Sequence, residues 1–151
     1  MPYLNKTCNL SSYTSRSKLQ HGGNILVTEI CKQYLDALNE GSIEKVLSLF
    51  VPNAVVVSPL YGTLPATTFY QDLFADTNRS DTKLLNIFHS ISGNTSVALH
   101  FNYIWTLKSG KVVEFECVDV FEITADSKQF TKLTIIYDTA PIRADFNESQ
   151  V

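Results

Sequence analysis

Asp119 is the residue of this chain whose sequence surroundings point most clearly to chemistry. Residues 112–123 alternate like a half-buried strand, in which successive side chains point to opposite faces. One face carries a single carboxylate among apolar residues: Val113, Phe115, Cys117, Asp119, Phe121 and Ile123. A carboxyl group on an apolar face must be paired, hydrogen-bonded or neutral, and a neutral one can donate a hydrogen bond for catalysis. Asp119 is therefore a candidate catalytic residue, and the alternative is a structural anchor for a neighbouring Tyr or backbone amide.

The hairpin formed by 96–107 and 111–123 decides which side chains join Asp119, and the sequence allows two registers. A two-residue turn places His100 directly opposite Asp119, where the two would form an acid–base pair. A three-residue loop with a bulge places Phe101 opposite Asp119 instead. The pattern favours this second register, because it puts apolar residues against apolar residues.

In the favoured register, the aromatic residues of 96–107 share the face of Asp119. Phe101, Tyr103 and Trp105 then form an apolar slot that suits a flat ligand. An aromatic stripe of this kind also suits a protein interface, where Tyr and Trp are enriched. A place in a dimer interface therefore stays open for Tyr103 and Trp105.

The spacing of apolar residues predicts the helices that must hold these side chains in place. Residues 1–23 are rich in Ser, Asn, Thr and Lys, and they predict a mobile N-terminal arm. Helical spacing then predicts a first helix over 24–39 and a third helix over 65–76, with a short second helix that Ser42 caps.

Alternation with a period of two predicts the strands. They are expected at about 54–57, 83–91, 96–107, 111–123 and 130–140. Helices followed by a meander of long strands indicate one α+β domain over 24–143 with an antiparallel sheet. A frayed tail is expected at 144–151.

Charge and composition argue against several classes of partner. The chain has 12 Lys and Arg against 15 Asp and Glu, without a basic cluster, so we expect no nucleic-acid partner. Its apolar runs are too short for a bilayer span or a secretion signal, so we expect no membrane partner and a cytoplasmic location. Cys8, Cys31 and Cys117 are scattered and the acids and histidines lack metal-ligand spacing, so we expect no disulfide framework, metal or cofactor.

The order of these elements resembles the nuclear transport factor 2-like (NTF2-like) fold over about residues 24–142. Residues 34–44, in which a helix ends in a short polar turn, are similar to the opening of that family. The stretch from Phe50 to Val55 resembles its aromatic-x-x-Asp/Asn-Ala-x motif. The resemblance implies a cystatin-like cone, in which three N-terminal helices pack on a curved antiparallel sheet and enclose an apolar pocket.

Within that fold, the chain resembles the ketosteroid isomerases and the SnoaL-like polyketide cyclases. The isomerases bind a developing enolate with a Tyr on the first helix and an Asp on the penultimate strand, and Tyr34 and Asp119 match these positions. Tyr70 resembles a further Tyr on the third helix. The isomerase base, an Asp before a Pro, is replaced here by Ser58, and a serine hydroxyl cannot shuttle a proton between carbons unaided near pH 7.

The resemblance and the residues leave two functions open. In the first, the chain binds a small hydrophobic molecule in the pocket, lacks classical steroid isomerase activity and forms a homodimer through the outer sheet face. In the second, it is an enolate-handling isomerase or cyclase with the catalytic residues Asp119, Tyr34 and His100. The candidate ligand-binding residues are Ser58, Tyr70, Phe101, Tyr103, Trp105, Phe115 and Tyr137. The sequence leaves the identity of the ligand undetermined.

Overall fold

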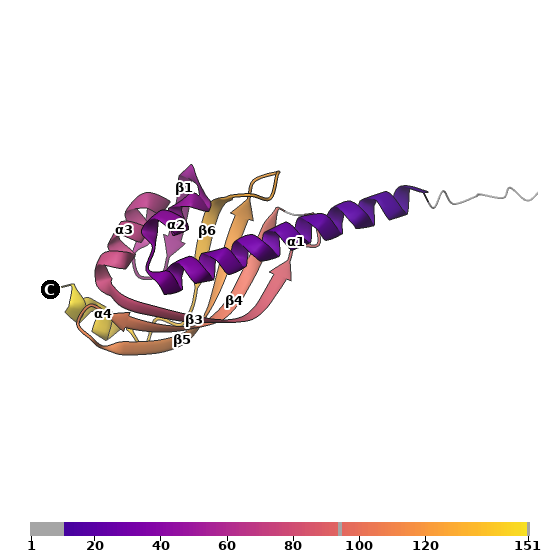
Figure 1. The fold of residues 1–151 in the computed structure, drawn as a ribbon. Coiled ribbons are helices and arrows are strands. Elements are labelled where there is room, and N and C mark those ends of the chain that lie inside the picture. The colour runs from indigo at the N-terminus through magenta and orange to yellow at the C-terminus, as the bar shows by residue number, and fades with distance from the viewer. Residues whose placement is uncertain (1–10, 94, 151) are drawn as a thin grey trace, which may run out of the picture.

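A curved six-stranded sheet that wraps around one long helix forms the frame of the molecule (Figure 1). The computed structural model describes residues 11–93 and 95–150. Along the chain, the helices are α1 (Ser11–Glu40), α2 (Ile43–Ser48), α3 (Ala66–Asp76) and α4 (Arg143–Ser149). The strands are β1 (Phe50–Ser58), β2 (Gly62–Pro65), β3 (Thr77–His89), β4 (Ser96–Leu107), β5 (Val112–Ile123) and β6 (Phe130–Ile136). The predicted α+β architecture, with helices packed on a curved sheet, is confirmed.

The strand order in the sheet is β2-β1-β6-β5-β4-β3. All neighbouring strands are antiparallel except β1 and β6, which run parallel, so the prediction of a purely antiparallel sheet is wrong at this pair. Between β1 and β6 the chain passes through α3 and four other strands, so the direction of β6 is not fixed by a hairpin with β1. The short strand β2, which the sequence pattern did not reveal, pairs with the end of β1.

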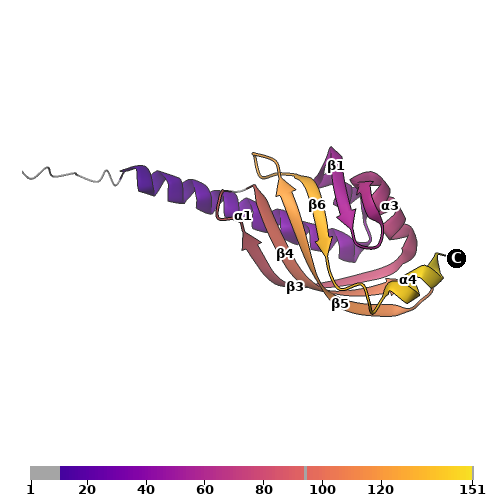
Figure 2. The same ribbon diagram turned by 180° about the vertical axis from the view of Figure 1, so that it is seen from behind.

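Helix α1 starts earlier than the sequence predicts. It begins at Ser11 rather than at residue 24, and its first turns extend beyond the sheet (Figures 1 and 2). Residues 11–23 of the predicted arm are thus helical, and residues 1–10 lie outside the described part. Each glycine in a helix costs only about 1 kcal/mol, so two adjacent glycines do not stop a helix whose later turns are packed.

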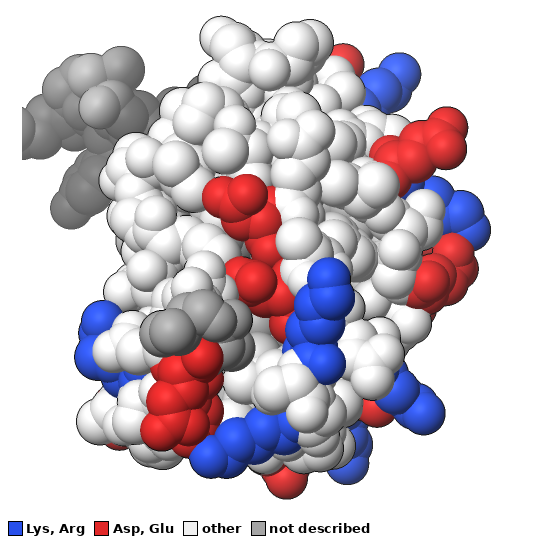
Figure 3. All heavy atoms as spheres, turned by 90° about the vertical axis from the view of Figure 1, so that its left-hand side faces the viewer, with Lys and Arg blue, Asp and Glu red and all other residues white. Residues whose placement is uncertain are grey.

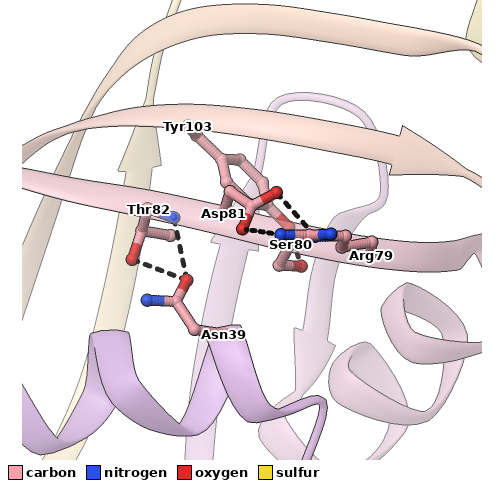
Figure 4. Close-up of polar contacts among 6 residues, drawn as sticks. All are labelled: Asn39, Arg79, Ser80, Asp81, Thr82 and Tyr103. Atoms are coloured by element: carbon pink, nitrogen blue, oxygen red, sulfur yellow. Dashed lines mark hydrogen bonds and ion pairs between the residues drawn. The ribbon is translucent and has the colours of Figure 1, made fainter.

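The C-terminal half of α1 packs one apolar stripe against the concave face of the sheet. Val27, Cys31, Tyr34 and Leu38 are all buried, at the spacing of successive turns. Near the end of the helix, the Asn39 side-chain oxygen accepts hydrogen bonds from the backbone N–H and the hydroxyl of Thr82, at 2.8 and 2.9 Å (Figure 4). These bonds join α1 to the edge strand β3.

The C-terminal residues form a helix where the sequence predicts a frayed tail. Ile142 and Phe146 are buried, and the Phe146 ring contacts the rings of Tyr61 and Trp105 at centroid distances of 5.0 and 6.4 Å. An ion pair between Lys111 and Asp145 attaches α4 to the loop after β4. These apolar contacts explain why a segment rich in polar residues is ordered.

The hairpin of β4 and β5 has a register that the sequence analysis did not anticipate. Its loop has three residues, because the Leu107 N–H donates to the Lys111 carbonyl at 2.8 Å and Gly110 takes a positive φ of 89°. Since no bulge follows, Leu99 lies opposite Asp119. Both predicted partners, His100 and Phe101, are therefore displaced from that position.

Two further observations concern membranes and nucleic acids. Within the residues described, every helix is too short or too polar to cross a membrane. On the face that Figure 3 shows, basic side chains are separated from one another by acidic and uncharged surface. The expected cytoplasmic location and the expected lack of a nucleic-acid partner both stay predictions.

Candidate functional site

A pocket lies on the concave side of the sheet, beneath α1 and α3. Its wall is mostly aromatic and aliphatic: Tyr34, Leu38, Ser58, Tyr61, Phe69, Leu73, Phe101, Tyr103, Trp105, Phe115, Cys117, Asp119, Ile135 and Tyr137. Its cavity volume is about 40 Å³. Eight of the ten site residues that the sequence predicts line this wall, and the other two, Tyr70 and His100, do not.

Among the described residues that line the pocket, Asp119 is the one carboxylic acid, and only 2% of its surface is exposed. One of its oxygens accepts a hydrogen bond from the Tyr34 hydroxyl, and the other accepts one from the Cys117 thiol, both at 3.2 Å. Burial raises the pKa of Asp119 from 3.8 to about 7, although both hydrogen bonds act to lower it. The carboxyl group can therefore exist in both protonation states near neutral pH, as a general acid or base requires.

Three side chains from separate elements form a buried hydrogen-bonded chain. Tyr70 of α3 donates to the Tyr34 hydroxyl at 3.0 Å, and Tyr34 of α1 donates to Asp119 of β5. Burial raises the pKa of both tyrosines well above 10.0, so both hydroxyls are protonated at neutral pH. The Tyr34 hydroxyl thus accepts a hydrogen bond from Tyr70 and donates its own proton to Asp119.

Cys117 belongs to the pocket wall, although the sequence analysis did not name it as a candidate site residue. It lines the pocket two residues before Asp119, and burial, followed by the charge of Asp119, raises the pKa of its thiol. The thiol is therefore a protonated donor to the carboxylate and is a poor nucleophile. The alternation of 112–123 already placed this side chain on the face of Asp119, and its role could have been inferred from that position.

The aromatic residues of β4 turn their polar ends toward β3. The Tyr103 hydroxyl shares a hydrogen bond of 2.8 Å with Ser80, and the Trp105 indole N–H donates to the Thr77 hydroxyl at 2.8 Å (Figure 4 shows the first pair). The two rings are stacked, with an angle of 10° between their planes. Because the polar groups are satisfied elsewhere, these residues offer the pocket mainly apolar ring surface.

A second pair of rings continues this wall. Phe115 of β5 stacks on Tyr137, which follows β6, with ring centroids 4.4 Å apart and an angle of 29° between the planes. Phe115 also meets Tyr103 edge to face at 5.3 Å. Rings from β4, from β5 and from the residue that follows β6 thus form this part of the wall.

His100 lies on the opposite face of the sheet from Asp119. Its ring nitrogens contact Glu116 at 3.0 Å and Asn86 at 3.1 Å, both of them exposed groups on the convex side. The structure does not bring His100 to Asp119, so the predicted acid–base pair is wrong. The reason is the side-chain period of two, since a register shifted by one residue moves a side chain to the other face.

Ser58 stands at the end of β1, where only 6% of its surface is exposed. Its hydroxyl oxygen accepts hydrogen bonds from the backbone N–H groups of Leu60 and Tyr61, at 3.3 and 3.2 Å. The Tyr61 hydroxyl in turn donates to Asp76 at 2.6 Å. Ser58, at the position that resembles the isomerase base, therefore contributes a hydroxyl group and not a carboxylate to the pocket wall.

Metal ligation has no support in the described part of the chain. His, Cys, Asp and Glu side chains do not gather there in any group of three or more that could hold an ion. The expectation that the site works without a metal or other cofactor stays a prediction.

Comparison with known families agrees with this geometry. The sequence model of the SnoaL-like domain family matches residues 31–130. The chain belongs to the SnoaL-like domain family. Among curated proteins, none matches the sequence.

Solved structures share the fold of this SnoaL-like chain at low identity. BvnE pinacolase from Penicillium brevicompactum has 15% identity and a TM-score of 0.69, over 85% of this chain and 92% of the other. A hypothetical protein with a ketosteroid isomerase-like fold from Catenulispora acidiphila has 12% identity and a TM-score of 0.66, over 77% of this chain and 90% of the other. A putative SnoaL-like polyketide cyclase from Jannaschia sp. has 13% identity and a TM-score of 0.64, over 78% of this chain and 89% of the other. NTF2-like and cystatin-like proteins are also among the similar structures, and the predicted fold is confirmed.

Proposed function

We propose that this SnoaL-like chain binds a small, largely apolar molecule in the pocket and recognises one of its oxygen atoms through Asp119. The observation that carries this proposal is a buried carboxyl group in an otherwise aromatic wall. Each carboxyl oxygen holds one protein donor, so each keeps a lone pair for a ligand hydroxyl. When Asp119 is protonated, the same group can donate to a carbonyl or enolate oxygen.

Tyr34 has a different part in this proposal from the one that the sequence suggests. The sequence pairs Tyr34 and Asp119 as joint donors to one ligand oxygen. In the structure, they bond to each other at 3.2 Å, and Tyr70 occupies a further site on the Tyr34 hydroxyl. Tyr34 therefore positions Asp119, and Asp119 makes the contact with the ligand.

The pocket must widen before it can hold a ring. A volume of about 40 Å³ accommodates water, whereas a cavity that binds benzene measures about 150 Å³. Tyr61 lies in the turn between β1 and β2 and contacts Phe146 of α4. Movement of this turn together with the short C-terminal helix opens the pocket without disturbing the sheet.

A second function, an enolate-handling isomerase or cyclase, is favoured by the pKa of Asp119. A value of about 7 lies near the pH at which an acid–base catalyst works best. Because Ser58 supplies no carboxylate, Asp119 would itself remove a proton from the carbon beside a carbonyl group and return it to another atom. A putative SnoaL-like polyketide cyclase from Jannaschia sp. has the same fold.

A titration with phenol tests the binding proposal. We expect saturable binding to the wild type that weakens by about tenfold in Asp119→Asn, because a charge-assisted hydrogen bond is lost. Asp72→Asn makes the same chemical change at an exposed position of α3 and is the matched control. Failure of phenol to bind the folded wild type, or equal binding by Asp119→Asn, would identify Asp119 as a structural anchor.

The proposed homodimer uses the convex face of the sheet. Phe88 of β3 and Ile136 of β6 are more than half exposed there, and Val118 and Val120 lie between them on β5. An apolar area of this kind is suited to a second copy of the chain. We expect a dimer in sedimentation velocity at micromolar concentration and a monomer after Val118→Glu. A monomeric wild type at that concentration would contradict the proposal.

A further inference from the structure

Within the described part of the chain, the Ser58 hydroxyl has two hydrogen-bond donors as partners and no acceptor. A hydroxyl group has one proton and two lone pairs. Two backbone N–H groups, those of Leu60 and Tyr61, already use the lone pairs of the Ser58 oxygen. Among the residues that the structure describes, none accepts the remaining proton. Because only 6% of Ser58 is exposed, bulk water is not a ready substitute.

Most other hydroxyl groups of the pocket wall form hydrogen bonds with side chains of the protein. Tyr61 donates to Asp76, Tyr34 donates to Asp119, and Tyr103 shares its bond with Ser80. A tyrosine hydroxyl can turn and exchange the roles of donor and acceptor. Ser58 differs, since with both lone pairs in use it can only donate.

Ser58 and Asp119 lie in one row across the concave face. Asp119 is opposite Ile135 in the antiparallel pair of β5 and β6. Val57 is opposite Thr134 in the parallel pair of β1 and β6, so the next residue of each strand brings Ser58 beside Ile135. Two strand spacings separate the backbones of Ser58 and Asp119 by about 10 Å. All three side chains of the row line the pocket.

We propose that Ser58 is a second recognition point of the pocket, which donates a hydrogen bond to an acceptor oxygen at the far end of the ligand. This inference rests on the proposed binding function and specifies its ligand class. The ligand is a short, apolar, ring-containing molecule with an oxygen at each end. One oxygen meets Asp119, and the other is a carbonyl or ether oxygen that meets Ser58. A single ring with substituents on opposite sides, plus a hydrogen bond of about 3 Å at each end, bridges this row.

Two phenols of nearly equal size test the inference. Para-methoxyphenol has an acceptor oxygen at its far end, and para-ethylphenol carries a methylene group there. We expect the wild type to prefer the methoxy compound by about fivefold, the typical effect of one hydrogen bond. We expect Ser58→Ala to lose this preference, whereas Ser58→Thr keeps the hydroxyl and should retain it.

A further variant separates recognition from the shape of the turn. Ser58→Ala removes the acceptor for the N–H groups of Leu60 and Tyr61, and the turn could rearrange. In Ser58→Asp, a carboxylate can accept both N–H bonds, because aspartate forms the same local turn, but it cannot donate. We expect Ser58→Asp to fold and to prefer the ethyl compound, since its carboxylate repels the methoxy oxygen.

The outcomes distinguish failure of this inference from failure of the binding proposal. If both phenols bind in an Asp119-dependent manner and the ratio of their affinities is equal in wild type, Ser58→Ala and Ser58→Asp, only the role of Ser58 is refuted. If neither phenol binds to the wild type, the pocket is not a binding site and both proposals are refuted.

Discussion

The pH dependence of stability gives the most direct test of the environment assigned to Asp119. The change is Asp119→Asn, which keeps the size of the side chain and removes its ability to ionise. Burial raises the pKa of Asp119 from 3.8 to about 7 in the folded chain, and unfolding restores the lower value. Between these values, the folded chain keeps a proton that the unfolded chain has lost. Wild-type stability therefore falls as the pH rises through this window and levels off above it.

The size of the effect follows from the two pKa values. One pKa unit corresponds to about 1.36 kcal/mol. Integrated from about pH 5 to about pH 8, the titration of Asp119 lowers the free energy of unfolding by about 2.5 kcal/mol. The Asn variant lacks this contribution, so relative to the wild type it should gain that amount over the same range. The substitution also changes the free energy of unfolding by altering hydrogen bonds. This contribution is the same at both pH values, so it cancels from the change with pH.

Urea unfolding at several pH values measures the difference. With a typical slope of about 2 kcal/mol/M, the gap between the two midpoints should change by about 1 M across the range. Other titrating groups are shared by both proteins and drop out of the comparison. If the difference between the two midpoints stays constant with pH, the raised pKa of Asp119 is refuted. If the difference changes with pH in the opposite direction, the fold stabilises the ionised form of the carboxyl group.

Three further predictions concern residues that support the site. Tyr34→Phe should lower stability by about 1–3 kcal/mol in urea unfolding, because it removes a donor to Asp119 and the acceptor of another buried hydroxyl. It should also raise the pKa of Asp119 further, and an unchanged pH profile would contradict this. Asn39→Ala should cost about 1 kcal/mol through the two bonds from Thr82, whereas Asn39→Asp, which keeps the acceptor, should cost less. Phe146→Ala should lower stability by about 3 kcal/mol and speed phenol association in stopped-flow experiments, and an equal association rate would rule out opening through α4.

Local patterns predicted the parts of the fold that depend on neighbouring residues. The alternation in β4 and β5 correctly placed their apolar faces, because the side-chain period of a strand is a local property. The sequence also predicted the helix cap at Ser42 correctly, because the Ser42 hydroxyl accepts a hydrogen bond from the Lys45 N–H within one turn. The start of α1 and the helix α4 were predicted wrongly. Their sequences are polar, and α4 is ordered by apolar contacts with distant segments.

The sequence by itself determined that a carboxyl group faces the apolar side of a strand, and the family resemblance placed Tyr34 and Ser58 around the same pocket. Only the tertiary structure decided how these groups meet. In the structure, Tyr34 donates a hydrogen bond to Asp119, His100 lies on the convex face, and Ser58 lies in one row with Asp119. The physical reason is that register and packing are set by contacts between residues far apart in the chain, such as the 85 positions between Tyr34 and Asp119. Periodicity along one segment carries no information about those contacts.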